Sequence, residues 1–212
     1  VYDPRVSRTL IGHLAGAING TSIARGTSFL LEMMDKQIFP ENINITDNPH
    51  ILRGPSSRPF DGEGVKNAPL AITQQGMLRN WVLDSTSARQ LDLVSNGRAS
   101  RGTSSPPSPS TTNLFMEAGS ISAKDLISDI KDGFYVTELI GSSVNGITGD
   151  YSRGASGFWI ENGILTYPVN EITIAGNLKE MYMQMTAADD LEIKYGTDAP
   201  TVRIDKMMLA GS

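Results

Sequence analysis

The strongest constraint on the fold is a hairpin signal in the second half of the chain. Asn162-Gly163 separates two apolar, strand-like runs, residues 157–161 and 164–167. An Asn-Gly pair is typical of a type I′ turn, whose twist matches that of two antiparallel strands. Further strand-like runs lie on both sides, without regular alternation with helices. The sequence therefore predicts an α+β fold, mainly antiparallel β-sheet and barrel- or sandwich-like, with a few packed helices.

A glycine-rich helix is expected at the start of the chain. Pro4 suits its first turn, and Asp3 can cap it. Apolar residues recur at spacings of three and four, which predicts a buried face made of Val6, Leu10, Leu14, Ala17 and Ile18. On another face Gly12, Gly16 and Gly20 lie four residues apart. Because glycine costs about 1 kcal/mol at each helical site, this spacing predicts that something packs close to the backbone there. The simpler interpretation is a sheet of the same fold, and the alternative is a ligand or the backbone of a partner.

Shorter elements follow along the chain. Helical segments are expected at residues 27–36, 87–93, 123–130 and 177–185. Strands are expected at residues 43–45, 70–83 (a pair), 113–116, 134–140, 172–174, 190–194 and 201–209. Residues 95–112 are rich in serine and proline. Such sequence buries little, so they are predicted to form an exposed flexible loop within the domain.

The residue types that a hydrolytic or metal site needs are scarce. The chain has no cysteine, which excludes disulfides and thiolate chemistry. Its two histidines are His13 and His50, and a zinc site needs three or four ligands. We interpret His13 as a residue of the helix surface or core edge, and His50 as a turn residue. The sequence also lacks a serine nucleophile elbow and a phosphate-binding loop.

The charge balance disfavours a nucleic-acid partner. The net charge is −5, from 18 basic and 23 acidic residues, and no basic run is long enough to follow a phosphate backbone. No apolar stretch is long enough to span a membrane, so no membrane partner is expected. Because the chain begins at Val1 and not at Met, we expect it to be a fragment of a longer protein.

A short motif recurs along the chain. Arg-Gly-Thr-Ser occurs at residues 25–28 and 101–104, and residues 153–156 are a near variant. Such runs can form backbone nests that bind a carboxylate or a peptide end, although turn preference is the simpler explanation. The residues proposed as a peptide-binding or structural motif are Arg25, Gly26, Arg153, Gly154 and Ser156.

Four segments together resemble one protein family. They are the RGTS run at residues 25–28, RPFDGEGV at 58–65, GDYSRGASGFWIENG at 149–163 and YPVNEITIAGNL at 167–178. Over residues 1–212 the chain is similar to the C-terminal domain of the TldD/PmbA family, once called modulators of DNA gyrase. Within that family it is closer to the PmbA branch, also called TldE. The resemblance implies that the family's N-terminal domain is absent from this chain.

The resemblance also implies where a catalytic site would lie. The TldD branch is a zinc metalloprotease with a His-Glu-x-x-x-His helix, and it acts with TldE as a heterodimer on peptides that include a bacteriocin precursor and an antitoxin. Counted back from the shared Gly-Thr-Ser, the three motif positions fall on Ile11, Gly12 and Gly16. None of these can bind zinc or act as a base, and the family's further cysteine ligand has no counterpart. The resemblance therefore implies no catalytic residue, metal ligand or cofactor in this chain.

The leading hypothesis is a non-catalytic, cytoplasmic subunit. It would pair with a TldD-like paralogue that holds the zinc, or with a second copy of itself, and would help to process peptides. One alternative is an independent hydrolase with a carboxylate-based metal site that uses Asp61, Glu63 or Asp150. Another is a binding protein that modulates DNA gyrase, as the historic family name suggests. The acidic balance of the chain argues against this last alternative.

Overall fold

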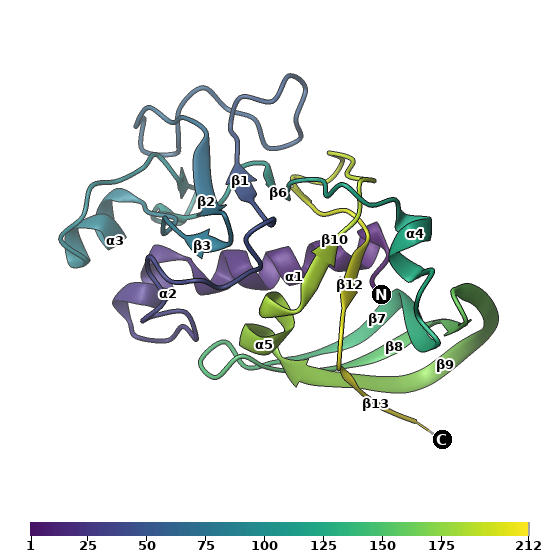
Figure 1. The fold of residues 1–212 in the computed structure, drawn as a ribbon. Helices are drawn as coiled ribbons and strands as arrows, with labels where there is room; N and C mark the ends of the chain where they lie inside the picture. Colours follow the sequence, from purple (N-terminus) through teal and green to yellow (C-terminus); the bar gives the residue numbers. More distant parts are fainter. Residues whose placement is uncertain (212) are drawn as a thin grey trace.

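The first helix, α1 (Pro4–Ala17), lies between the two main sheets of the computed structural model, which describes residues 1–211 (Figure 1). The predicted start of the helix is confirmed, because the Asp3 carboxylate accepts a hydrogen bond of 3.0 Å from the backbone N–H of Arg5. The predicted apolar stripe is buried along its whole length. On one side α1 contacts β6 (Leu114–Met116) and β11 (Thr197–Asp198), and on the other it contacts β7 (Asp132–Val144).

The larger sheet is built around the predicted hairpin. Its strand order is β13-β9-β8-β7, with all pairs antiparallel; β8 is Asp150–Glu161, β9 is Ile164–Asn177 and β13 is Met208–Ala210. Asn162 and Gly163 have φ angles of 49° and 77°, the left-handed values that a type I′ turn needs. The hairpin prediction is therefore confirmed.

The smaller sheet has the order β11-β6-β1-β2-β3, and only its β11–β6 pair is parallel. It contains β1 (Ile45–Asp47), β2 (Leu70–Gln74) and β3 (Met77–Leu78). Two further strand pairs are β4 (Ala99–Ser100) with β5 (Ser108–Pro109), and β10 (Met185–Ala187) with β12 (Val202–Ile204). The remaining helices are α2 (Gly20–Ala24), α3 (Ser85–Gln90), α4 (Ala123–Ile127) and α5 (Leu178–Met183). The predicted α+β class is confirmed; of the two architectures expected, the fold is sandwich-like, since residues 1–211 form no closed barrel.

The helix predicted at residues 27–36 is wrong. This segment forms successive turns, in which the N–H groups of Met33 and Lys36 donate to carbonyl groups three residues earlier. Asp35 has a φ of 57°, which no helix interior allows. Phe29 is nevertheless buried, so the apolar content that suggested a helix belongs to a buried turn segment.

The strand predicted at residues 190–194 is also wrong. The Asp190 carboxylate accepts hydrogen bonds from the backbone N–H and the hydroxyl of Thr201, at 2.8 and 2.7 Å. A side chain thus attaches this segment to the residues before β12, in place of a backbone ladder. The alternation of residue types alone does not distinguish a strand from an irregular segment that a side chain holds in place.

The loop predicted at residues 95–112 is exposed over only part of its length. Its continuously exposed stretch is residues 101–106, and β4 and β5 pair on either side of that tip. Arg98 and Thr112, at the two ends of the segment, are buried. The serine- and proline-rich composition identified the exposed tip but not these buried ends.

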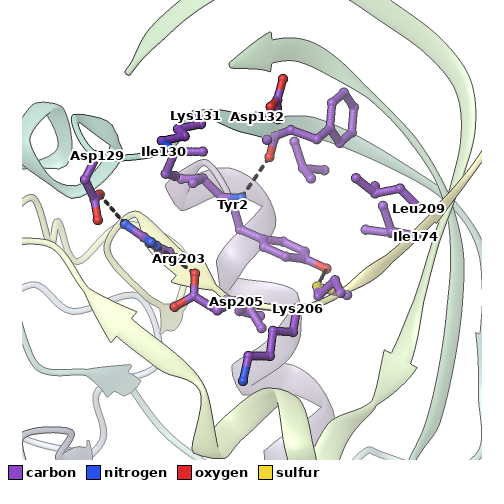
Figure 2. Close-up of a pocket in the computed structure, with 16 residues that line it drawn as sticks. Tyr2, Asp129, Ile130, Lys131, Asp132, Ile174, Arg203, Asp205, Lys206 and Leu209 are labelled. Atoms are coloured by element: carbon purple, nitrogen blue, oxygen red, sulfur yellow. Dashed lines mark hydrogen bonds and ion pairs between the residues drawn. The ribbon is translucent and has the colours of Figure 1, made fainter. Parts of the chain in front are cut away.

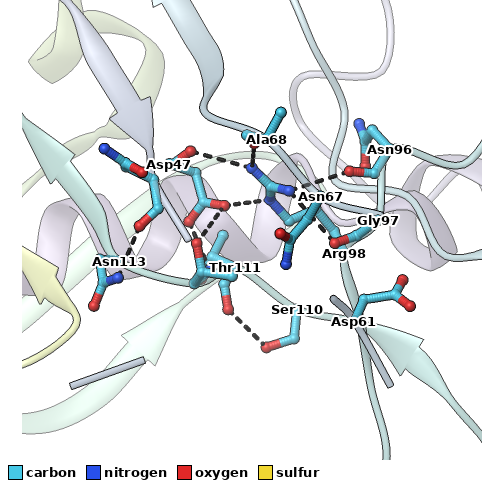
Figure 3. Close-up of polar contacts among 12 residues, drawn as sticks. Asp47, Asp61, Asn67, Ala68, Asn96, Gly97, Arg98, Ser110, Thr111 and Asn113 are labelled. Carbon is cyan, nitrogen blue, oxygen red and sulfur yellow. Dashed lines mark hydrogen bonds and ion pairs between the residues drawn. The ribbon is translucent and has the colours of Figure 1, made fainter. Parts of the chain in front are cut away.

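A buried ion pair holds the ends of this segment in place (Figure 3). Arg98 and Asp47 pair through their side chains, and both side chains are fully buried. The Asp47 carboxylate also accepts hydrogen bonds from the backbone N–H and the hydroxyl of Thr112, at 2.6 and 2.9 Å. The guanidinium donates further to four backbone carbonyl groups, including that of Ala68 at 2.6 Å. One arginine thereby joins β1, the segment before β2 and the start of β4.

Candidate functional site

The candidate site is a groove along one face of α1. The resemblance aligns Ile11, Gly12 and Gly16 with the metal motif of the catalytic branch. Ile11 points away from the groove into the hydrophobic core and has no exposed surface. Gly12 and Gly16 are exposed, lie one turn apart and line the groove. The three aligned positions therefore do not share one environment.

The groove is a cavity of about 310 Å³ between segments that are distant in sequence. Its floor is α1, and one wall is formed by α2 and the turn segment after it, where Ser22 and Phe29 line the cavity. The opposite wall is the turn between β7 and β8 together with Leu178 at the start of α5. The Phe29 N–H donates to the Gly146 carbonyl at 2.9 Å and so joins the two walls at one end. In Figure 1 the turn between β7 and β8 extends toward α2 beneath α1.

The prediction that a sheet of the same fold packs closely against Gly12 and Gly16 is wrong. A Cβ atom built at either position would meet no heavy atom within 4 Å. Only Gly20, the first residue of α2, is closely approached: there a Cβ would lie 2.5 Å from the Ser87 hydroxyl and 2.8 Å from Leu83. The three glycines therefore share a spacing of four residues but not an environment, since Gly12 and Gly16 are open and Gly20 is closely packed.

We expect Gly12→Ala to raise the free energy of unfolding by about 1 kcal/mol, and Gly16→Ala, in the last turn of α1, to raise it by less. Alanine is the better helix former by about that amount, and the added methyl group meets no neighbour at either position. Urea unfolding followed by tryptophan fluorescence measures the change. Gly20→Ala is the matched control and should be destabilising, because its methyl group would meet Ser87 and Leu83. A lower free energy of unfolding in Gly12→Ala or Gly16→Ala would contradict the finding that no other element packs against these positions.

His13 lies at the edge of the core and lines the groove. Its ring meets that of Tyr151 on β8 edge-on, with centroids 6.1 Å apart. Its Nε2 atom is buried and has no hydrogen-bond partner among residues 1–211. Burial lowers the pKa of His13, and the nearby Arg153 guanidinium lowers that pKa further, so the imidazole is neutral at pH 7.

The first Arg-Gly motif ends a helix. Arg25 is the C-cap of α2, and Gly26 follows with a φ of 67°. The N–H of Arg25 donates to the Thr21 carbonyl at 3.1 Å, and that of Gly26 donates to the Ile23 carbonyl at 3.0 Å. These groups are used by the helix end, as is common where glycine follows a C-cap.

The other two motifs lie elsewhere in the fold. Arg101 lies in the exposed tip of residues 101–106. Arg153, Gly154 and Ser156 lie in β8 and pair with neighbouring strands. The three motifs thus lie on different elements. Of their arginines only Arg153 lowers the pKa of His13, and Arg153 does not itself line the groove.

The acidic residues considered for a carboxylate-based site are used by the fold. Asp61 is buried and its carboxylate accepts three backbone N–H groups at 2.9 to 3.0 Å. Glu63 accepts the N–H of Ser85 at 2.9 Å. Hydrogen bonds from Thr148 and Asn177 lower the pKa of Asp150. Within residues 1–211 no group of three or more His, Asp or Glu residues is placed to hold a metal ion, so the residues present do not fit the family's zinc.

A larger cavity, of about 440 Å³, lies between the start of β7 and the β12–β13 connection (Figure 2). Arg203, on its rim, is already paired with Asp129 and Asp205. The Tyr2 hydroxyl donates to Met207 Sδ at 3.5 Å, and burial raises the pKa of Tyr2. These groups are satisfied within the fold, so we regard this cavity as structural.

Comparison with known proteins identifies the protein family of this chain. The model of the PmbA/TldA metallopeptidase C-terminal domain matches residues 1–211. The chain is 42% identical to metalloprotease PmbA of Escherichia coli O157:H7, covering 100% of this chain and 45% of that protein. It is 40% identical to the metalloprotease PmbA homolog of Haemophilus influenzae, covering 98% of this chain and 44% of the relative. The chain belongs to the PmbA/TldD family, as its C-terminal domain.

The fold comparison agrees with this assignment. A crystal structure from Bacteroides thetaiotaomicron, described as a candidate modulator of DNA gyrase, superposes with a TM-score of 0.89 at 28% identity; the match covers 100% of this chain and 46% of that one. The chain thus spans less than half the length of each of these three proteins. None of the helices in residues 1–211 is long and apolar enough to cross a membrane.

Proposed function

We propose that this chain is part of a non-catalytic subunit of a TldD/TldE-type peptidase, in which a TldD-like partner holds the zinc. One observation carries the proposal. Of the positions aligned with the zinc motif, Gly12 and Gly16 line an open groove without offering a ligand, and Ile11 is buried in the core. Zinc in proteins is bound by His, Cys or carboxylate side chains. By the resemblance, this is the face of α1 that carries the metal in the catalytic branch, and here its aligned positions offer no metal-binding side chain.

Family membership supports peptide processing as the function of the assembly. By the resemblance, its substrates are peptides such as bacteriocin precursors and antitoxins, processed in the cytoplasm. We propose a heterodimer with the catalytic paralogue before a homodimer, because a pair of two such chains would contain no zinc motif. This chain would then contribute surface and support to the partner's cleft.

The proposal is tested with the TldD-like paralogue of the same genome. Cleavage of a fluorogenic peptide is measured with the paralogue alone and after addition of the protein that carries this chain. We expect cleavage to increase, and zinc to be found by metal analysis in the paralogue. Arg101→Gln, in the exposed tip of residues 101–106, is the control and should stimulate as well as the unsubstituted chain.

Two outcomes would contradict the proposal. Cleavage that is the same with and without this protein would show that it is not a supporting subunit. Stoichiometric zinc or manganese in this protein alone, together with its own peptidase activity, would favour the independent hydrolase.

A further inference from the structure

The start of the chain joins two sheets. Residues 1–3, the N-terminal link, lie between β12 and β7. Toward β12, the Tyr2 N–H donates to the Val202 carbonyl at 2.7 Å and the Val202 N–H donates back at 3.1 Å, as in an antiparallel pair. Toward β7, the Val136 N–H donates to the Val1 carbonyl at 2.8 Å, and the pairing is parallel. The N-terminal link is therefore a strand that the two sheets share.

The hydrogen-bond ladders on both sides of this link stop at Val1 with open groups. Every second residue of a strand turns its backbone groups to the same side, so Phe134 faces as Val136 does, and Ile204 faces as Val202 does. The Phe134 carbonyl accepts the Val1 amine at 2.8 Å. The Phe134 N–H and both backbone groups of Ile204 have no partner on this side in the described part of the chain.

A cavity lies where these ladders stop. It is the cavity of about 440 Å³ in Figure 2, bounded by the start of β7 and by the connection from β12 to β13. Val1, Phe134 and Ile204 all line it. The open backbone groups and the open space therefore coincide, and together they have the form of a slot for extended chain.

The amino group of Val1 is poorly placed for a free chain end. Chain termini usually lie at the surface of a domain, whereas the fold encloses this amine, and no carboxylate of residues 1–211 pairs with it. Burial, with a smaller contribution from the Arg203 guanidinium, lowers the pKa of the amine to about 5. A peptide N–H in the same place would keep the hydrogen bond to Phe134 without burying a charge.

The relatives indicate what continues from this point. More than half of each relative compared above lies outside the region that this chain matches. Because the matched region is the family's C-terminal domain, the chain of a full-length protein enters it at this end. We propose that the two residues immediately before Val1 in the full-length protein continue the N-terminal link as an extended strand between β7 and β12, and so occupy this cavity.

Each of these two residues has a defined set of partners. Continuation of the antiparallel pairing makes the residue before Val1 exchange two hydrogen bonds with Ile204. Continuation of the parallel pairing makes the residue before that one accept the Phe134 N–H and donate to the Asp132 carbonyl. The preceding part of the protein is thereby fixed to this domain by sheet pairing and not by a flexible linker. This proposal is independent of the proposed function, since all of its contacts lie within one chain.

Hydrogen exchange in the full-length protein tests the ladder. With isotopically labelled phenylalanine, isoleucine and valine, NMR follows the N–H groups of Phe134 and Ile204 beside those of Val136 and Val202, which are bonded to the N-terminal link. We expect the first pair to exchange as slowly as the second, within about tenfold. Val94, in an exposed loop, is the fast reference. Exchange of Phe134 and Ile204 at the rate of Val94 would overturn the proposal.

Substitution of the residue before Val1 separates the ladder from mere proximity. Proline there has no N–H to donate to the Ile204 carbonyl, so the Ile204 N–H should exchange about tenfold faster or more, the effect of one lost hydrogen bond. Alanine at the same position keeps its N–H and should leave the exchange unchanged. Equal exchange in the two variants would contradict the pairing. A natural proline at either of the two positions before Val1 would also overturn it, because each must donate an N–H.

A cross-link tests the same register without removing a hydrogen bond. Residues of a hydrogen-bonded antiparallel pair have Cα atoms about 5.5 Å apart, a separation that a disulfide spans. Cysteine at the residue before Val1 should therefore form a disulfide with Ile204→Cys under mild oxidation, identified by peptide mapping. Val94→Cys, in the exposed loop, replaces Ile204→Cys in the control and should form none. Absence of the first disulfide, or formation of both to the same extent, would overturn the proposal.

Discussion

Arg98→Met is expected to lower the free energy of unfolding by about 3–5 kcal/mol, the usual cost of removing one partner of a buried ion pair. Arg98 and Asp47 have no exposed side-chain surface. Methionine fills part of the space but leaves the Asp47 carboxylate with only the two hydrogen bonds from Thr112. The carbonyl groups that the guanidinium serves, including that of Ala68, also lose a donor. Urea unfolding followed by the fluorescence of Trp81 and Trp159 measures the loss.

Arg79→Met is the matched control for this prediction. Arg79 pairs with Asp35 at 2.7 Å, but both side chains are substantially exposed, so the loss should be below about 1 kcal/mol. Combining Arg98→Met with Asp47→Asn should cost less than the sum of the two single changes, because the double variant leaves no unpaired buried charge. A similar small loss for Arg98→Met and Arg79→Met would contradict the anchoring role of the buried pair.

Ile11→His is expected to lower the free energy of unfolding by about 2–5 kcal/mol, at least as much as truncation of a buried isoleucine to alanine. Ile11 has no exposed surface and belongs to the main hydrophobic core. An imidazole there also needs hydrogen-bond partners that an apolar core does not provide. Rebuilding the zinc motif in this chain therefore requires more than three substitutions, since its first position would disturb the core.

Gly16→His is the informative comparison for this second prediction. Position 16 is exposed and open, so histidine should be tolerated there with little change in stability. Thermal unfolding of the two single variants and of Ile11→His/Gly12→Glu/Gly16→His compares the three positions directly. A triple variant that bound zinc without loss of stability would show that position 11 can turn toward the groove.

Features that depend on a few neighbouring residues could be predicted from the sequence. Asp3 and Pro4 start α1 because capping and a fixed proline φ act within one turn. Asn162 and Gly163 form the hairpin because few residue pairs accept two positive φ angles. The helix predicted at residues 27–36 is wrong for the complementary reason. Phe29 and Leu30 are buried in the core that distant elements form, without helical backbone.

The positions on α1 that align with the zinc motif show what the sequence determined and what the tertiary structure decided. The sequence alone determined that the side chains of Ile11, Gly12 and Gly16 offer no metal ligand, because none of them contains a nitrogen, oxygen or sulfur atom. Only the tertiary structure decided that Gly12 and Gly16 line an open groove while Ile11 and Gly20 are enclosed. Only the tertiary structure also placed Tyr151, 138 positions beyond His13, edge-on against that imidazole. Packing joins segments whose separation along the chain leaves no local pattern, so the composition of such a site follows from the fold and not from periodicity.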